Sequence, residues 1–213
     1  MTFALTNYLN RLIHLNIELM KISRLIIVLF IGFSFFQLQA QNVYKALPDD
    51  ENSILIEGTS NIHDWEIIVE GFTSELDLTQ EKNKALSVTS INLTIPVESL
   101  KSGKSKMDKN TYKALESDAY ALISFKSRTP AFFEEVAPGV YQAEVKGNLS
   151  ISGTSKAVEI PLKLYKSPEG YTLKAEKELT MLDFDIEPPT ALFGTITTGE
   201  IVNIKFNLKH YKS

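Results

Sequence analysis

Residues 141–164 read YQAEVKGNLSISGTSKAVEIPLKL, and apolar residues occupy every second position on both sides of a central polar cluster. The alternating apolar positions are Tyr141, Ala143, Val145, Gly147, Leu149 and Ile151 in the first half, and Val158, Ile160, Leu162 and Leu164 in the second. A period of two is typical of β-strands that bury one face. The cluster at residues 152–155 has the length of a hairpin turn, so the stretch predicts a β-hairpin.

The same alternation recurs along the chain. Residues 202–209 place Val202, Ile204, Phe206 and Leu208 on one face of a terminal strand. Further candidate strands span residues 53–57, 65–72, 86–97, 122–127 and 171–179, which brings the number to eight. Eight antiparallel strands are enough to close a barrel. We therefore expect an all-β fold, an extended eight-stranded antiparallel barrel with one short helix.

The long strand at residues 86–97 changes phase along its length. Leu86 and Val88 are apolar at even positions, whereas Ile91 and Leu93 are apolar at odd positions. One extra residue in the strand would restore the alternation, so we predict a β-bulge near Thr89 or Ser90.

The short helix is expected to begin in the run Ser105-Lys106-Met107-Asp108, which fits a capping pattern. A helical repeat then places Met107, Thr111, Ala114 and Leu115 on one face. The helix should lie across the barrel and end before Tyr120.

The first forty residues have the pattern of a secretory signal peptide. Lys21 and Arg24 precede an apolar run at residues 25–36, and small and polar residues follow around Ala40. The run is shorter than the ~20 residues that span a bilayer. We expect a signal peptide at 20–40 with cleavage near Ala40, and a periplasmic or secreted protein that is soluble after cleavage. Residues 1–19 are expected to lie upstream of the true start at Met20, and residues 41–52 to lead into a barrel domain at 53–213.

Charge and cysteine content exclude several classes of function. The chain has a net charge of −4 and a pI near 5.5, which disfavours a nucleic-acid partner. The first forty residues hold three basic side chains and one acidic one, so the remainder carries −6. The absence of cysteine excludes disulfides, thiolate metal sites and a lipid-modified cysteine.

The stretch at residues 60–65 contains Ser60, His63 and Asp64, the residue types of a hydrolytic triad. Adjacent residues in a strand point to opposite faces, so His63 and Asp64 would not act together. Ser60 also lacks the glycine-flanked strand-to-helix turn that exposes a nucleophile. We expect this segment to build a wall of the barrel, with no catalytic residue.

Two other polar patterns are weighed against structural roles. Asp183, Asp185 and Glu187 alternate, but the glycine and distant glutamate of a calcium loop are missing. Only His63 and His210 follow residue 40, too few for a histidine zinc site. We predict no metal and no cofactor other than a bound lipid.

Five lysines between Lys101 and Lys113 form a basic cluster on an otherwise acidic chain. The Gly-Lys-Ser within it lacks the upstream glycine of a phosphate-binding loop, because that position is Glu98. A solvated helix face is the main interpretation, and transient contact with a membrane surface is the alternative.

Large apolar residues also gather in a proline-rich segment, residues 181–194. A long apolar loop beside a barrel serves as a plug or a lid. Packing of this segment against the core is the default expectation.

Several short blocks resemble the YceI-like family, in the order in which that family has them. They are residues 58–65 (GTSNIHDW), 69–72 (VEGF), 95–100 (IPVESL), 107–108 (MD), 123–125 (ISF) and 145–156 (VKGNLSISGTSK). The resemblance covers essentially the whole chain after residue 41. It implies a lipocalin-like barrel, export, and in some members a polyisoprenoid or quinone-type lipid inside the barrel. It implies no catalytic residues.

We therefore expect an exported, non-enzymatic protein that sequesters or carries an isoprenoid-type or other long-chain lipid. Strand parity and the apolar loop select the expected lining, which consists of Trp65, Ile67, Val69, Phe125, Tyr141, Val145, Leu162, Phe184, Phe193 and Phe206. One alternative is a scaffold or interaction module whose barrel is filled by its own side chains. A hydrolase that uses Ser60 and His63 is a weaker alternative, and the oligomeric state, with a dimer as one option, stays open.

Overall fold

The computed structural model describes Met20 and residues 42–80, 86–128 and 130–213. The chain divides into two units, residues 1–40 and 41–213, and the account below concerns the second. The predicted upstream segment and signal peptide lie outside the described residues, apart from Met20. Within the described residues, no helix is both long and apolar enough to cross a membrane.

The described chain is mostly strand. Its strands are β1 (Asn42–Ala46), β2 (Ser53–Ser60), β3 (Trp65–Val69), β4 (Thr73–Gln80), β5 (Leu86–Pro96), β6 (Leu100–Lys101), β7 (Leu122–Ser127), β8 (Ala131–Ala137), β9 (Val140–Ile151), β10 (Thr154–Lys166), β11 (Gly170–Thr180), β12 (Thr190–Ala191) and β13 (Ile196–Lys212). The helical elements are η1 (Val97–Ser99), α2 (Ser105–Ala114) and η2 (Met181–Phe184).

The sheet closes on itself as an antiparallel barrel, and the predicted fold class is confirmed. The strand order runs β1-β4-β5-β7-β9-β10-β11-β13, and β13 returns to β1 through Tyr211 and Lys212. Along its first half, β13 pairs with β2, and β2 pairs with β3. The pairs β1/β2, β3/β4, β5/β6 and β7/β8 therefore each act as one interrupted strand, and β9, β10, β11 and β13 complete the eight.

The predicted hairpin between β9 and β10 is confirmed. Ile151 pairs with Thr154, so the turn itself contains only Ser152 and Gly153, with φ of 47° and 76°. Two left-handed residues form the turn whose twist matches that of antiparallel strands. A side chain at Gly153 would also collide with the Tyr120 ring, which lies 2.5 Å from the position of a Cβ atom.

The predicted bulge is also confirmed. Asp77 of β4 pairs with Ser90, and the next residue, Leu78, pairs with Val88, so Thr89 is the extra residue. The strands that sequence periodicity missed are β1, β4 and β8, together with the two-residue β6 and β12. In particular, β1 lies in the segment expected to be a lead-in, and it pairs with both β4 and β13.

The helix forms where it was expected, but its predicted cap is wrong. The N-cap residue is Lys104, whose side chain makes no capping hydrogen bond. The Asp108 carboxylate instead accepts hydrogen bonds from the backbone N–H and the hydroxyl of Ser102, at 2.8 and 2.5 Å. These bonds hold the pKa of Asp108 below its usual value. They tie the first turn of the helix to the loop before it.

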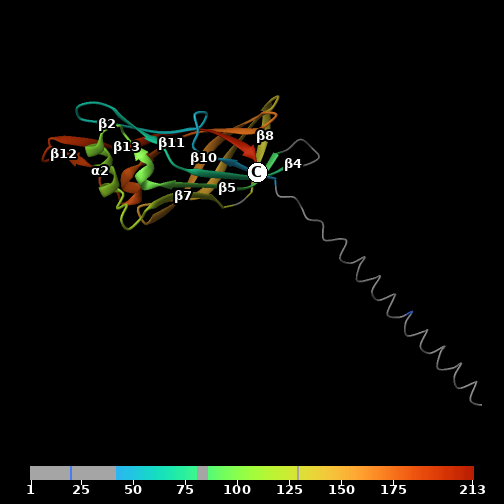
Figure 1. Cartoon of the computed structure of the whole chain (residues 1–213), viewed down its shortest axis with the longest axis horizontal. Helices are drawn as coiled ribbons and strands as arrows, with labels where there is room; N and C mark the ends of the chain where they lie inside the picture. Colours follow the sequence, from blue (N-terminus) through green and yellow to red (C-terminus); the bar gives the residue numbers. More distant parts are fainter. Residues whose placement is uncertain (1–19, 21–41, 81–85, 129) are drawn as a thin grey trace, which may run out of the picture. The chain divides into compact units, whose positions relative to one another are not determined.

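The barrel has one solid half and one hollow half. The solid half contains fully buried side chains from β4, β5, β8, β9 and β10, among them Leu76, Val88, Phe133, Val145 and Leu164. Figure 1 shows β4, β8 and the C terminus at this end of the barrel, and α2, β2 and β12 at the opposite end. The hollow half, at the second end, contains the candidate site.

Candidate functional site

The hollow half encloses an apolar cavity of about 520 Å³. This volume lies within the range of about 300–1,000 Å³ that is typical of small-molecule sites. Eight strands contribute aliphatic residues to its wall, among them Ile54, Ile56, Ile67, Ile91, Leu93, Ile95, Ile123, Leu149, Ile151, Ile160, Leu162, Leu173, Leu179, Val202, Ile204 and Leu208. The arrangement suits a ligand that presents hydrocarbon over most of its surface.

Six of the ten predicted lining residues lie on the cavity wall. They are Trp65, Ile67, Phe125, Leu162, Phe184 and Phe206. The rings of Trp65 and Phe125 each lie against a glycine of the neighbouring strand. A Cβ atom on Gly58 would lie 2.1 Å from the Trp65 indole, and one on Gly147 would lie 2.3 Å from the Phe125 ring. Because glycine has no side chain, Gly58 and Gly147 leave the space in which the two rings pack.

Four predicted lining residues do not reach the cavity, and their predicted positions are corrected here. Tyr141 and Val145 are buried on the inward face of β9, but they lie in the solid half. Val69 is buried beside Leu100, and Leu100 is the member of this pair that reaches the wall. Phe193 is fully exposed to solvent.

The tyrosines of the solid half explain why the cavity stops there. The rings of Tyr44 and Tyr171 pack edge to face with centroids 5.2 Å apart. Burial, with Tyr44 and Tyr141 nearby, raises the pKa of Tyr171 to about 12. These aromatic side chains occupy the barrel interior that smaller aliphatic residues leave open in the other half.

The expected helix face contributes one side of the cavity. Met107, Thr111, Ala114 and Leu115 all line it, as does Asn110. The apolar loop is divided between two environments. Phe184 and Ile186 are buried and line the cavity, as the packing expectation requires, whereas Leu192 and Phe193 are exposed.

Among the residues that the structure describes, the lining includes cationic side chains and no carboxylates. Lys104 and Lys106 of the α2 region are exposed, and Lys177 is half-buried between the inward-facing Ala175 and Leu179. Among the described residues, no carboxylate lies within ion-pair distance of these three lysines. His63 adds an exposed imidazole to the same lining. The cavity therefore combines an apolar wall with positive charge.

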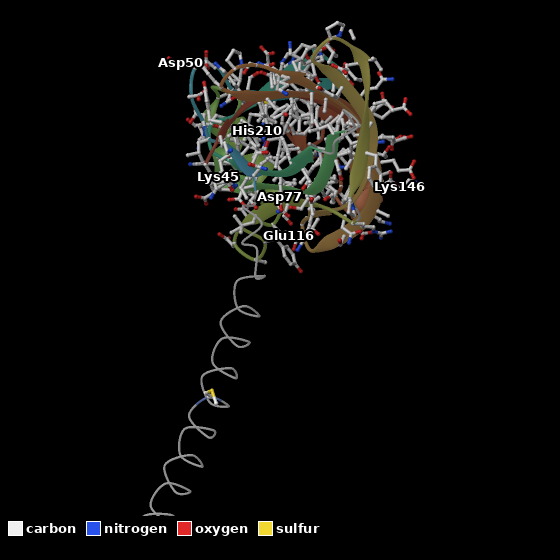
Figure 2. The ribbon with its side chains drawn as sticks, turned by 90° about the vertical axis from the view of Figure 1, so that its right-hand side faces the viewer. Lys45, Asp50, Asp77, Glu116, Lys146 and His210 are labelled. Atoms are coloured by element: carbon white, nitrogen blue, oxygen red, sulfur yellow. The ribbon has the colours of Figure 1, made fainter. Side chains whose placement is uncertain are left out.

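A buried serine and histidine mark the floor of the cavity. Ser74 lines the cavity, and its hydroxyl lies 2.8 Å from Nε2 of His210, which is completely buried. Nδ1 of His210 lies 3.0 Å from the carbonyl oxygen of Leu208, which can only accept a hydrogen bond. Nδ1 therefore carries the proton, and Nε2 accepts from Ser74. Figure 2 shows His210 inside the barrel, with Lys45, Asp50 and Lys146 around its outside.

The protonation state of His210 follows from this environment. Burial lowers the pKa of His210 to about 4, only partly offset by its hydrogen bond to the Leu208 carbonyl. A neutral imidazole with so low a pKa is a weak general base near pH 7. The pair with Ser74 therefore satisfies two buried polar groups in an apolar floor.

The hydrolase-like residues at the start of β3 do not converge. The Ser60 hydroxyl donates to the backbone carbonyl of His63 at 2.6 Å, and Nδ1 of His63 bonds to the backbone carbonyl of Asp64 at 2.8 Å. All three residues shape a turn through main-chain contacts. Trp65, which follows them, donates from Nε1 to the carbonyl of Thr59. These contacts position the wall strand.

The acidic loop residues likewise do not gather around a common point. Asp185 accepts a hydrogen bond from the Thr154 hydroxyl at 2.8 Å. In the part of the chain that the structure describes, no three His, Cys, Asp or Glu side chains are placed to hold a metal ion.

Comparisons with solved structures show the same barrel in other proteins. A polyisoprenoid-binding domain from Saccharophagus degradans, implicated in plant cell wall breakdown, shares 11% identity with a TM-score of 0.63, over 79% of this chain and 98% of that one. BcnA from Burkholderia cenocepacia shares 17% identity with a TM-score of 0.57, over 74% and 94%. A YceI protein from Campylobacter jejuni shares 13% identity with a TM-score of 0.53, over 68% and 84%. The search of curated proteins gives no match.

The family model for the YceI-like domain matches residues 55–210. The match begins in β2, ends in β13 and includes every strand of the hollow half. It agrees with the order of sequence blocks and with the closed eight-stranded barrel. The chain belongs to the YceI-like domain family.

Proposed function

We propose that the protein is an exported, soluble binding protein, periplasmic or secreted, that holds an isoprenoid-type or other long-chain lipid inside its barrel. The observation that carries the proposal is the cavity of about 520 Å³ with an aliphatic wall. The described side chains leave this space open, and the polar groups on its lining are few. A hydrocarbon chain is the ligand class that such a surface favours.

The energetics of burial support a chain of this kind. Each buried methylene contributes about 0.8 kcal/mol, so a dozen chain carbons contribute roughly 10 kcal/mol before the entropic costs of association. No specific polar contact is needed for useful affinity. The Saccharophagus degradans domain of the same fold, which is described as binding polyisoprenoid, supports the isoprenoid class.

The geometry argues against both alternatives, for different reasons. A scaffold with a filled barrel would need side chains in the space between α2 and the cavity floor, and the open volume there favours carriage. A hydrolase would need a nucleophile and a base within reach of each other. The side chains of Ser60 and His63 instead bond to main-chain carbonyls, which favours a binding role.

Native mass spectrometry of the protein as cells export it, followed by organic extraction, tests the proposal. We expect an adduct that yields a polyprenyl, quinone or other long-chain lipid. Ala175→Trp should fill the cavity and remove the adduct, because Ala175 lines it. Lys174→Trp adds the same side chain to the outer face of the same strand and should retain the lipid.

The negative outcome is equally specific. Recovery of no lipid, together with no uptake of an added polyprenyl or quinone probe by the wild-type protein, would overturn carriage. Equal lipid content in Ala175→Trp and Lys174→Trp would place the lipid outside this cavity.

A further inference from the structure

The turn between β12 and β13 carries two large apolar residues where small polar ones are favoured. Leu192 and Phe193 have φ of 50° and 56°, and the N–H of Gly194 donates to the carbonyl of Ala191 at 3.1 Å. With Gly194, at φ of 86°, they form three consecutive left-handed residues in the four-residue connection between β12 and β13, a conformation that favours Gly and Asn. A bulky side chain in this conformation is disfavoured because its Cβ crowds the backbone.

The same two residues are exposed to solvent. Phe193 is fully exposed and Leu192 is 57% exposed. The turn therefore combines a disfavoured backbone conformation with unburied apolar surface, and no contact within the described chain compensates for either at Phe193. Residues that adopt a disfavoured backbone conformation and expose apolar side chains often lie at functional sites.

A third exposed apolar residue lies beside this turn. Ile62, 57% exposed, lies in the turn between β2 and β3. Asn61 joins the two turns, because its side-chain amide donates to the carbonyl of Thr195 at 2.9 Å and accepts from the N–H of Thr197 at 3.0 Å. Ile62, Leu192 and Phe193 are called the mouth patch below.

The mouth patch continues into the cavity. Ile62 and Leu192 both belong to the cavity lining, so the mouth patch adjoins the apolar wall. Figure 1 shows β12 and α2 at the same end of the barrel. The exposed Lys104 and Lys106 line the cavity from the α2 side, and Lys109 and Lys113 are exposed on the same helix.

We propose that the mouth patch inserts into the surface of an anionic lipid bilayer, with Lys104 and Lys106 contacting the headgroups. The proposal rests on the proposed function in one respect, because the bilayer is then the source or destination of the lipid. The charge of the lysines complements anionic headgroups, which attract basic residues near a membrane surface. A patch of three side chains on two turns is too small for a stable protein–protein interface of standard size.

Vesicle partitioning of the exported protein tests the docking surface. Phe193→Asn removes the apolar side chain and places a residue that tolerates the left-handed turn, so the variant should fold at least as well as the wild type. Partitioning onto phosphatidylcholine–phosphatidylglycerol vesicles should fall about tenfold or more, the loss expected when a Phe side chain is no longer buried. Lys104→Gln with Lys106→Gln should weaken binding only when phosphatidylglycerol is present.

Phe132→Asn is the matched control. Phe132 is 66% exposed on β8, at the end of the barrel opposite to α2, and the same substitution there should leave partitioning unchanged. Partitioning of Phe193→Asn equal to the wild type would overturn the proposal, as would a wild-type protein that does not bind vesicles. A shift from dimer to monomer in Phe193→Asn, with vesicle binding intact, would assign the patch to a second copy of the chain and also overturn it.

The two proposals fail separately. If no lipid is recovered from the cavity but Phe193→Asn still loses vesicle binding, docking stands and carriage fails. If lipid is recovered normally and Phe193→Asn binds vesicles like the wild type, docking alone fails.

Discussion

Protonation of His210 should destabilise the folded protein in a defined pH window. The imidazole is completely buried, and its pKa falls from an ordinary value of 6.5 to about 4. Between these two pH values the unfolded chain binds a proton at this position and the folded chain does not, so the free energy of unfolding decreases as the pH falls. The difference corresponds to about 3 kcal/mol, because one pKa unit is equivalent to about 1.4 kcal/mol. Above pH 6.5 the contribution is constant.

Urea unfolding of the wild type and of His210→Gln at several pH values between 7.5 and 4 measures this contribution. The carboxylates are the same in both proteins, so the difference between their free energies of unfolding isolates His210. As the pH falls across this window, the free energy of unfolding of the wild type should decrease by about 3 kcal/mol relative to that of the variant. A difference that stays constant with pH would refute the reasoning. An NMR titration of the wild-type imidazole provides a second measurement, and a midpoint near 6.5 would refute it as well.

Two further predictions concern Phe125 and Trp65, two aromatic residues of the cavity wall. Gly147→Ala should lower the free energy of unfolding by about 1–3 kcal/mol, because the added methyl group meets the Phe125 ring; an unchanged midpoint in urea would contradict this packing. Trp65 is the only tryptophan and lines the cavity, so a lipid brominated along its chain should quench its fluorescence saturably. The unbrominated lipid is the control, and a lipid that binds without quenching would have to lie elsewhere.

Sequence periodicity was sufficient to predict the eight-stranded barrel. Each of the eight strands expected from the sequence falls on a different strand of the closed sheet. The segments that it missed have weak patterns. In β4, the sequence TSELDLTQ buries only Leu76 and Leu78 as apolar residues, between charged and polar neighbours. In β1, five residues precede a Leu-Pro-Asp-Asp turn. β1 forms by pairing with β13 and β4, and β4 by pairing with β1 and β5, which no local pattern reports.

The candidate site was partly predictable for a related reason. Strand parity identifies the inward face of β9, but it cannot separate Tyr141 and Val145 from Leu149 and Ile151 on that face. That division depends on the aromatic residues that other strands bring into the solid half. The same alternation rule, applied to the strand at residues 53–57, would also have selected Ile54 and Ile56, which lie on the cavity wall.

Phe193 shows a second limit of sequence patterns. Its apolar character suggested burial, whereas it lies in a run of three left-handed residues, Leu192 to Gly194, of which only the last is a glycine. The backbone conformation was needed to locate this residue.

The interrupted strands divide the barrel mechanically. The cavity lining takes residues from β2, β3 and β7 but none from β1 or β8, and from β4 only Ser74. Breaks in the hydrogen-bond ladder therefore fall between the two halves on three of the four interrupted strands, while β9, β10, β11 and β13 run through both. If the hollow half widens to accept ligands of different width, the strand pairing of the solid half need not change. We therefore expect any ligand-dependent change in width to be confined to the hollow half.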